Sequence, residues 1–125
     1  MLKYSLMKPE GILLLDPRGP LTQQDFENLS KDVNAYLAEH DKLHGVMIRA
    51  EDFPGWENWS GLSAHLHFVR DHHKQVAHIA MVTDSHLAGM AEFLAKHFTA
   101  AEIRHFPYAE DSQALQWLLD SVLTA

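Results

Sequence analysis

The side chains most able to do acid–base chemistry or to bind a metal are ten histidines and seventeen acidic residues in a chain of 125 residues. Zinc ligands usually follow a short, recognisable spacing, such as two histidines one helical turn apart. His65 and His67 are two positions apart in a predicted helix, so their rings point to different sides. His40 and His44 have a suitable spacing only if a helix continues between them, which Gly45 disfavours. The sequence therefore predicts no metal site and no cofactor, and a zinc site built from distant residues has no support in it.

Ser60, followed by Gly61 and Leu62, is the serine whose position suggests chemistry, because it stands at the start of a predicted helix. A serine there usually accepts a backbone hydrogen bond as an N-cap, and this is the favoured interpretation. The same position would suit phosphorylation, since free N–H groups and the helix dipole stabilise added negative charge. The chain has no cysteine, no G-x-S-x-G motif and no glycine-rich phosphate loop. We therefore expect no enzymatic activity and retain Ser60 as a candidate phosphorylation site.

Three large aromatic residues, Phe53, Trp56 and Trp59, occupy a connection that would ordinarily be short and hydrophilic. The helix predicted to follow, over residues 60–72, has a wider apolar arc than contact with one sheet requires. An excess of this kind is typical of a pocket or a partner surface. We predict a binding site for an apolar or lipid-like small molecule, formed by the loop aromatics and the helix residues beside them: Phe53, Trp56, Trp59, Leu62, His65, Leu66 and Phe68.

Two other uses of the aromatic loop stay open. Trp56 and Trp59 could fold back as a small satellite cluster that seals the edge of the core, and this interpretation is as well supported as the pocket. The same rings could instead form the interface of a homodimer.

Composition narrows the class of protein and its partners. The length fits one domain over residues 1–125. The net charge of -7 and the scattered basic residues argue against nucleic acid as a partner, because phosphate binding needs clustered lysine and arginine. No apolar run approaches membrane-spanning length, and the first residues do not resemble a signal peptide. With no cysteine as well, a cytoplasmic protein without stable membrane insertion is expected.

Apolar patterns and turn residues predict five strands and about four helices. The strands cover residues 2–7, 12–15, 46–48, 76–82 and 102–106, and the helices begin after Thr22 and near residues 60, 87 and 112. Pro17 is expected to exclude residues 16–20 from a central strand, because proline lacks a donor for the ladder. The first two strands form a hairpin, and the later strands alternate with helices, which indicates parallel pairing. The expected fold is α/β: a single layered domain of order ββαβαβαβα with a mixed, mostly parallel five-stranded sheet.

The first and last helices show clear apolar stripes. Thr22 and Asp25 fit a weak capping box at the start of the first helix, whose buried face is predicted to hold Phe26, Leu29, Val33, Tyr36 and Leu37. The last helix is predicted to bury Leu115, Leu118, Leu119 and Val122. Trp117 lies opposite that stripe, and we expect it to be half-buried against a neighbouring terminus, with a dimer contact as the alternative.

Four segments in order carry a family resemblance: the Phe-Pro-Gly-Trp loop of residues 53–56, the strand of residues 79–84, and residues 102–106 and 114–118. Together they resemble the SpoIIAA-like proteins of bacteria, which are similar in fold to STAS domains and to the lipid-carrying CRAL-TRIO domains. The resemblance implies a mixed five-stranded sheet with four helices and no established enzymatic activity. It also implies binding of a small apolar or lipid-like molecule in a groove under mobile helices, and self-association.

Classical STAS domains begin their second helix with Asp-Ser-Ser-Gly-Leu, in which a partner kinase phosphorylates the serine before glycine. The corresponding segment here is Asn58-Trp59-Ser60-Gly61-Leu62, so the last three residues match and the two before them differ. A tryptophan beside Ser60 would crowd a kinase but suits an apolar ligand site. The resemblance therefore favours a non-catalytic cytoplasmic binding module, with a STAS-type protein-interaction regulator switched at Ser60 as the alternative.

Overall fold

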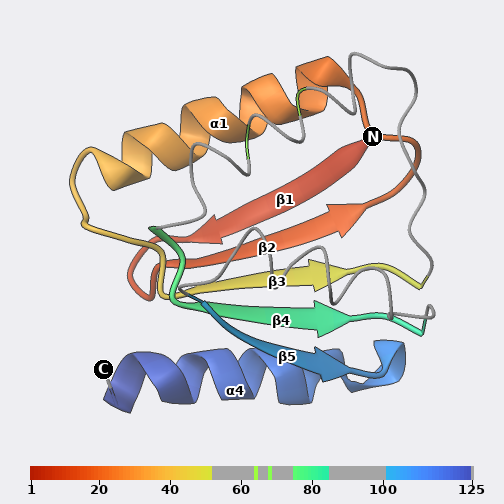
Figure 1. The fold of residues 1–125 in the computed structure, drawn as a ribbon, viewed down its shortest axis with the longest axis vertical. Coiled ribbons are helices and arrows are strands. Elements are labelled where there is room, and N and C mark those ends of the chain that lie inside the picture. Colours follow the sequence, from red (N-terminus) through yellow and green to blue (C-terminus); the bar gives the residue numbers. More distant parts are fainter. Residues whose placement is uncertain (52–63, 65–67, 69–74, 85–100, 125) are drawn as a thin grey trace.

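The computed structural model describes residues 1–51, 64, 68, 75–84 and 101–124, which form an α/β domain around one sheet (Figure 1). None of the helices in these ranges is long and apolar enough to cross a membrane. The elements are, in chain order, β1 (Leu2–Met7), β2 (Ile12–Pro17), α1 (Gln23–Leu37), β3 (Gly45–Arg49), β4 (His78–Val82), β5 (Glu102–Phe106), the short 3-10 helix η2 (Tyr108–Glu110) and α4 (Asp111–Thr124).

The five strands lie in one sheet in the order β1-β2-β3-β4-β5. β1 pairs antiparallel with β2, and the pairs from β2 to β5 are all parallel. This confirms the predicted hairpin and the mixed, mostly parallel sheet. Two of the four predicted helices are described as α1 and α4. The other two fall largely outside the described residues, although Ala64 and Phe68 in the expected 60–72 helix have helical backbone.

Successive strand residues point to opposite faces of the sheet, so each face has its own core. Figure 1 shows α1 and α4 flanking the sheet from opposite sides. The first core cluster lies on the α1 face and contains Leu13, Leu29, Val33, Tyr36, Leu43, Val46, Val76, Ile79 and Met81. The second core cluster lies on the α4 face and contains Ile12, Met47, Ala80, Val82, Phe106, Ala114 and Leu118.

β2 is longer than predicted, because it continues through Pro17. Pro17 lies opposite Leu2 of β1, but the Leu2 N–H donates to the Asp25 carboxylate at 3.2 Å. The next hydrogen bond of the hairpin runs from Arg18 N–H to Met1 C=O at 2.8 Å. β3 pairs only with residues Ile12 to Leu15 of β2, so Pro17 lies beyond its reach. The prediction that proline ends the strand was wrong, because this position needs no N–H donor.

β4 is shorter than predicted and begins at His78 rather than Val76. Val76 still forms a single parallel bridge with Leu43. Hydrogen bonds from Leu43 N–H to Gln75 C=O and from Ala77 N–H to Leu43 C=O hold this bridge at 2.8 and 3.1 Å. The apolar pattern therefore marks a buried segment that begins before the regular ladder.

α4 approaches the sheet through small residues. Ala114 and Leu118 are fully buried, whereas Leu115, Leu119 and Val122 are half-buried. A Cβ atom built on Gly45 would lie 2.7 Å from Leu118 Cδ2, so the glycine admits that side chain. The predicted stripe was correct for Leu118 but missed Ala114. The small alanine side chain lets α4 lie close to the sheet, whereas the prediction looked for large apolar side chains.

Trp117 is half-buried, as predicted, but its neighbours are strands rather than a chain terminus. Its ring lies 6.0 Å from the Phe106 ring of β5 and meets His78 of β4 edge-on at 5.6 Å. The indole therefore covers the second core cluster at the β4–β5 side of the sheet.

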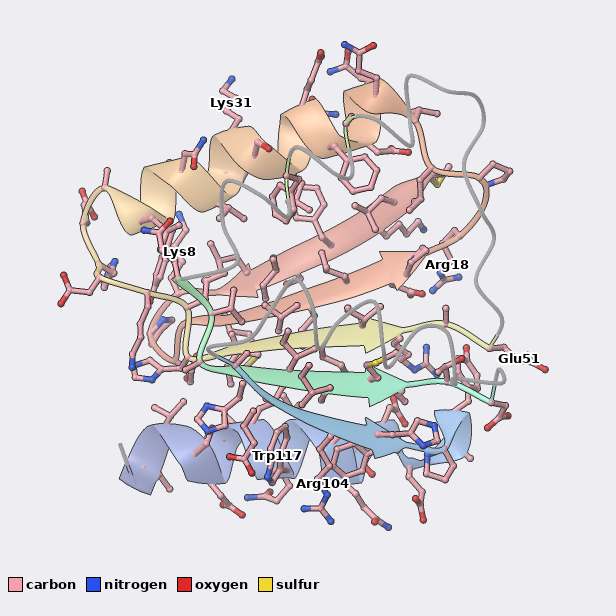
Figure 2. All side chains as sticks on the ribbon, in the orientation of Figure 1. Lys8, Arg18, Lys31, Glu51, Arg104 and Trp117 are labelled. Carbon is pink, nitrogen blue, oxygen red and sulfur yellow. The ribbon has the colours of Figure 1, made fainter. Side chains whose placement is uncertain are left out.

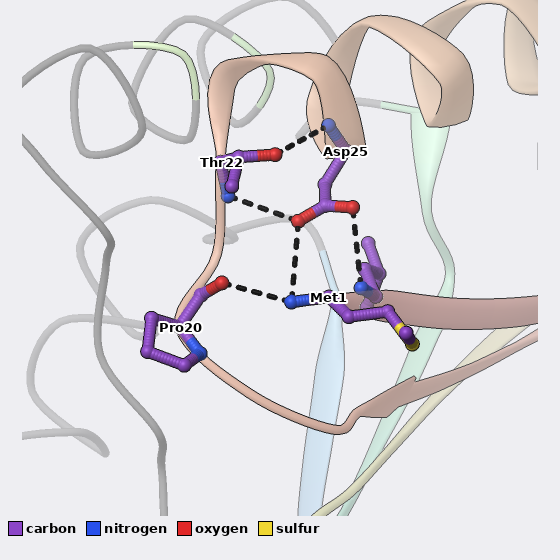
Figure 3. A network of polar contacts seen from close by, with 5 residues as sticks. Met1, Pro20, Thr22 and Asp25 are labelled. Carbon is purple, nitrogen blue, oxygen red and sulfur yellow. Dashed lines mark hydrogen bonds and ion pairs between the residues drawn. The ribbon is translucent and has the colours of Figure 1, made fainter.

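The start of α1 is fixed by the predicted capping box, which the structure confirms (Figure 3). Asp25 N–H donates to Thr22 Oγ1 at 3.1 Å, and Thr22 N–H donates to Asp25 Oδ2 at 2.9 Å. The same carboxylate accepts from Leu2 N–H at 3.2 Å and lies 3.6 Å from the Met1 ammonium. One side chain thereby joins the first strand to the first helix.

Candidate functional site

The carboxyl ends of β2 to β5 lie side by side along one border of the sheet, which we call the carboxyl edge. Open α/β sheets usually bind ligands there. Figure 2 shows Arg18 and Glu51 at this edge, after β2 and β3 respectively. The predicted aromatic loop leaves the sheet here, immediately after Glu51. The residues that hold Glu51 therefore fix the base of the loop.

Thr83 holds the base of the aromatic loop. Its side chain is buried, with 5% of the residue exposed, and its hydroxyl donates to Glu51 C=O at 3.1 Å. Two backbone bonds support the same connection, from Asp84 N–H to Glu51 C=O at 3.3 Å and from Ala50 N–H to Val82 C=O at 3.0 Å. These bonds join the residues that follow β3 to the end of β4 and the residues that follow it, so the position of Glu51 depends on β4.

The ends of β4 and β5 are tied to each other in the same way. Thr83 N–H donates to Phe106 C=O at 3.1 Å, and a His105 ring nitrogen lies 2.8 Å from Thr83 C=O. Asp84 accepts from Tyr108 N–H at 3.0 Å, which places η2 directly beyond the strands. Thr83 is therefore the residue through which three strand ends are connected.

A polar cluster fills the α4 side of this edge. Arg49 Nε lies 3.2 Å from Asp111 Oδ2, and the Arg49 guanidinium lies 4.4 Å from the centre of the Tyr108 ring. The Nε atom is buried and makes no well-aligned hydrogen bond, so the Asp111 contact is an ion pair without hydrogen-bond geometry. Arg18 pairs with Asp16 at 2.7 Å, and that carboxylate raises the pKa of Arg18 above its usual value. Arg49 and Arg18 thus each have a carboxylate partner, and the Arg49–Asp111 pair joins α4 to the strand ends.

Phe68 is the one predicted ligand-binding residue that lies within the described part of the chain. It has helical backbone, is half-buried and packs against the first core cluster. Its ring lies 6.2 Å from the Phe26 ring of α1, with the planes tilted by 46°. The other predicted site residues lie outside the described residues: Phe53, Trp56, Trp59, Ser60, Leu62, His65 and Leu66.

Sequence analysis missed the cluster at the strand ends. Arg49 directly follows an apolar strand, and Thr83 and Asp84 directly follow another, so polar residues after buried strands were the available signal. Among the described residues, no three histidine, cysteine or carboxylate side chains come close enough to share a metal ion.

The comparisons with known proteins agree with this architecture. Residues 12–119 match the SpoIIAA-like family. The chain belongs to the SpoIIAA-like family. A crystal structure of an uncharacterized protein of the DUF3478 family from Shewanella loihica PV-4, which has a SpoIIAA-like fold, is similar to this chain with a TM-score of 0.69. The two chains are 21% identical, and the similarity covers 94% of this chain and 92% of that one. A search of the curated proteins found no match.

Removing the Thr83 hydroxyl from this SpoIIAA-like protein is expected to loosen the base of the aromatic loop. Thr83→Val keeps the shape of the side chain but leaves the Glu51 carbonyl without that donor, so the free energy of unfolding should fall by about 1–2 kcal/mol. Urea denaturation measures the change. Thr83→Ser keeps the hydroxyl and should lose less than half as much; equal losses for both variants would show that the hydroxyl is not what matters.

Proposed function

We propose that this SpoIIAA-like protein is a non-catalytic binding module for an apolar or lipid-like small molecule, bound on the α1 face of the sheet. The observation that carries the proposal is the placement of Phe68. Its half-buried ring packs on the first core cluster beside Phe26, so the apolar surface of the domain extends onto the segment that holds the other predicted site residues.

The anchoring at residue 51 adds support. Thr83 ties the base of the aromatic loop to β4, so the loop starts from a fixed point at the carboxyl edge of the sheet. Loops on a rigid frame are where binding residues are concentrated. Apolar side chains of β2, β3 and β5 border the first core cluster on the same face and are half-buried: Leu15, Ile48 and Ile103.

The affinity expected from such a site follows from the apolar area that a ligand buries. Burial contributes about 25 cal/mol per Å². A chain-like ligand therefore reaches micromolar affinity with few polar contacts, and pockets for such molecules are mostly lined by apolar and aromatic side chains. A fatty acid or a membrane lipid extract is the appropriate probe.

Tryptophan fluorescence tests the proposal, because two of the three tryptophans belong to the predicted site and the third does not. Titration of the wild type with a long-chain fatty acid should shift the emission, and Trp56→Ala/Trp59→Ala should abolish the shift. Trp117→Phe is the matched control: Trp117 packs on the α4 face, so this variant should keep the shift. No shift in the wild type with fatty acids or extracted lipids, or an unchanged shift in the double variant, would refute the proposal.

Family membership supports a second function, that of a STAS-type protein-interaction module. We propose that phosphorylation of Ser60 would switch such a module. Its supporting observation is the Ser60-Gly61-Leu62 sequence at a predicted helix start. Intact mass measurement of protein purified from its native host under several growth conditions tests this function. A phosphorylated species that disappears in Ser60→Ala would support it, and a single unmodified mass under every condition would rule out the switch.

A further inference from the structure

β5 is an outermost strand of the sheet, and no strand within the described ranges pairs with its outer side (Figure 1). An edge strand presents backbone N–H and C=O groups with which a strand of another chain can pair. β1 is the other outermost strand and has Lys3 as its one charged residue, so it has no pair of opposite charges that could select a register. β5 differs, because it carries an acidic and a basic residue two positions apart, Glu102 and Arg104.

The backbone groups of β5 that point outward can be identified from its bonds to β4. Glu102 N–H donates to Ala77 C=O, just before β4, at 2.9 Å, and Phe106 C=O accepts from Thr83 N–H at 3.1 Å. Glu102 and Phe106 therefore direct their backbone groups inward. These directions alternate along a strand. Ile103 and His105 consequently direct their N–H and C=O groups away from the sheet.

We propose that two copies of this chain pair edge to edge through β5, antiparallel, with Ile103 opposite the partner's Ile103. The outward N–H and C=O groups of the two isoleucines then exchange a pair of hydrogen bonds across a two-fold axis. Glu102 lies directly opposite the partner's Arg104, and Arg104 lies opposite the partner's Glu102. These are the non-hydrogen-bonded positions, where Cα atoms about 4.5 Å apart bring side chains closest.

The charges of β5 select this register over its neighbours. The backbone bonds can also form after a shift of two residues in either direction. One shift places Glu102 opposite the partner's Glu102, and the other places Arg104 opposite the partner's Arg104, and like charges directly opposite are destabilising. A further shift places Pro107, which has no N–H, opposite the partner's Ile103. The self-complementary register alone sets opposite charges against each other twice.

The two charged side chains are positioned for these contacts. The Arg104 guanidinium lies 4.9 Å from the Phe106 ring centre and 5.9 Å from the Trp117 ring centre; Figure 2 labels Arg104 and Trp117. Stacking on two rings limits the freedom of the arginine before a partner binds. No carboxylate of the described ranges forms an ion pair with Arg104. The Glu102 side chain is 70% exposed and lies 3.6 Å from His78 Nε2.

The position of α4 leaves room for a second copy. α4 lies chiefly over β4 and β3, and Trp117 reaches from it toward β5. A two-fold axis perpendicular to the sheet would place both α4 helices on one face, each over its own β4 and β3. Among the described helices, the two α4 copies therefore do not stand between the two β5 strands. This dimer does not depend on the proposed ligand.

Sedimentation velocity over a range of protein concentrations at low salt tests the dimer with charge variants. The wild type should form dimers, and Glu102→Arg alone or Arg104→Glu alone should weaken association at least tenfold by opposing like charges. An equimolar mixture of these two variants should restore the dimer, because each strand then meets a partner strand of opposite charge. The double variant Glu102→Arg/Arg104→Glu should dimerise by itself. This pattern of loss and rescue is specific to the proposed register.

A backbone variant provides an independent check. His105→Pro removes an outward N–H without touching the ladder to β4, so it should abolish dimers, whereas His105→Ala, which also loses the ring, should keep them. Circular dichroism confirms that each variant is folded. The proposal would be overturned if the wild type stays monomeric up to the highest concentration. It would also be overturned if neither the charge variants nor His105→Pro change the association of the dimer. Loss of the dimer in Trp56→Ala/Trp59→Ala alone would overturn it as well, because it would place the contact at the aromatic loop.

Discussion

Leu118→Ala is expected to lower the free energy of unfolding by about 2–5 kcal/mol. The Leu118 side chain is fully buried in the second core cluster and faces Gly45 of β3. Truncation removes apolar contacts and leaves a cavity between α4 and the sheet, and the surrounding strands can fill it only in part. Urea denaturation followed by circular dichroism measures the loss. Leu123→Ala on the same helix is the control, because Leu123 is 83% exposed and its loss should change stability by less than about 0.5 kcal/mol.

A double-mutant cycle makes the same prediction more specific. Gly45→Ala by itself should destabilise the protein by about 1–3 kcal/mol, because the new methyl group would lie 2.7 Å from Leu118 Cδ2. In the Leu118→Ala background that atom is absent, so the added methyl should cost much less. Contacting residues are expected to show such coupling. Strict additivity of the two substitutions would contradict the close approach of α4 at Gly45.

Asp25→Asn is expected to lower the free energy of unfolding by about 2 kcal/mol at neutral pH. The carboxylate accepts from Thr22 N–H and Leu2 N–H and lies beside the Met1 ammonium, and an amide can satisfy these donors less completely. Loss of a helix cap alone costs about 0.5–2 kcal/mol, and hydrogen bonds to a charged group add to it. Figure 3 shows that these contacts converge on one side chain.

The effect of Asp25→Asn should depend on pH with a defined sign. Burial alone would raise the pKa of Asp25, but the Thr22 and Leu2 N–H donors and the Met1 ammonium outweigh burial and hold the pKa below its usual value of 3.8. A lowered pKa in the folded state means that the carboxylate stabilises the protein above pH 3.8 and that this contribution is lost as the pH falls through the folded-state pKa. The stability difference between wild type and variant should therefore be full at pH 6 and smaller at pH 3.

The control for this prediction is Glu27→Gln, which removes one negative charge from the exposed face of the same helix. Glu27 accepts from the Gln23 side chain and should contribute little to stability. Equal destabilisation by both substitutions, or a stability difference for Asp25→Asn that does not change between pH 6 and pH 3, would show that the network at Asp25 is not responsible.

Much of the fold could be predicted from the sequence because its signals are local. The boundaries of β1 and β5 were correct as predicted, and the capping box of Thr22 and Asp25 lies where the spacing placed it. A capping box involves residues three positions apart, and a strand pattern involves alternate residues, so both can be recognised without knowing what packs against them. The hairpin and the parallel pairing followed from the order of the elements.

The errors arose where a distant partner changes the meaning of a residue. Pro17 continues β2 because β3 pairs only with residues Ile12 to Leu15, so no neighbouring strand needs the N–H that proline lacks. Ala114 is central to the second core cluster because it lets α4 come close to the sheet, and an alanine gives no strong signal for this in a helical pattern. The resemblance that identified the family depended on several segments in order, none of them sufficient alone.

The sequence by itself determined the order of the described elements, the main apolar faces and the family, because these depend on neighbours along the chain. Only the tertiary structure decided that Thr83 connects three strand ends, that Arg49 reaches Asp111 and Tyr108, and that Arg104 stacks on Trp117. These residues are up to 62 positions apart, and a parallel sheet brings its carboxyl ends together whatever the length of chain between them. No spacing rule can predict such contacts, because they follow from strand order and register.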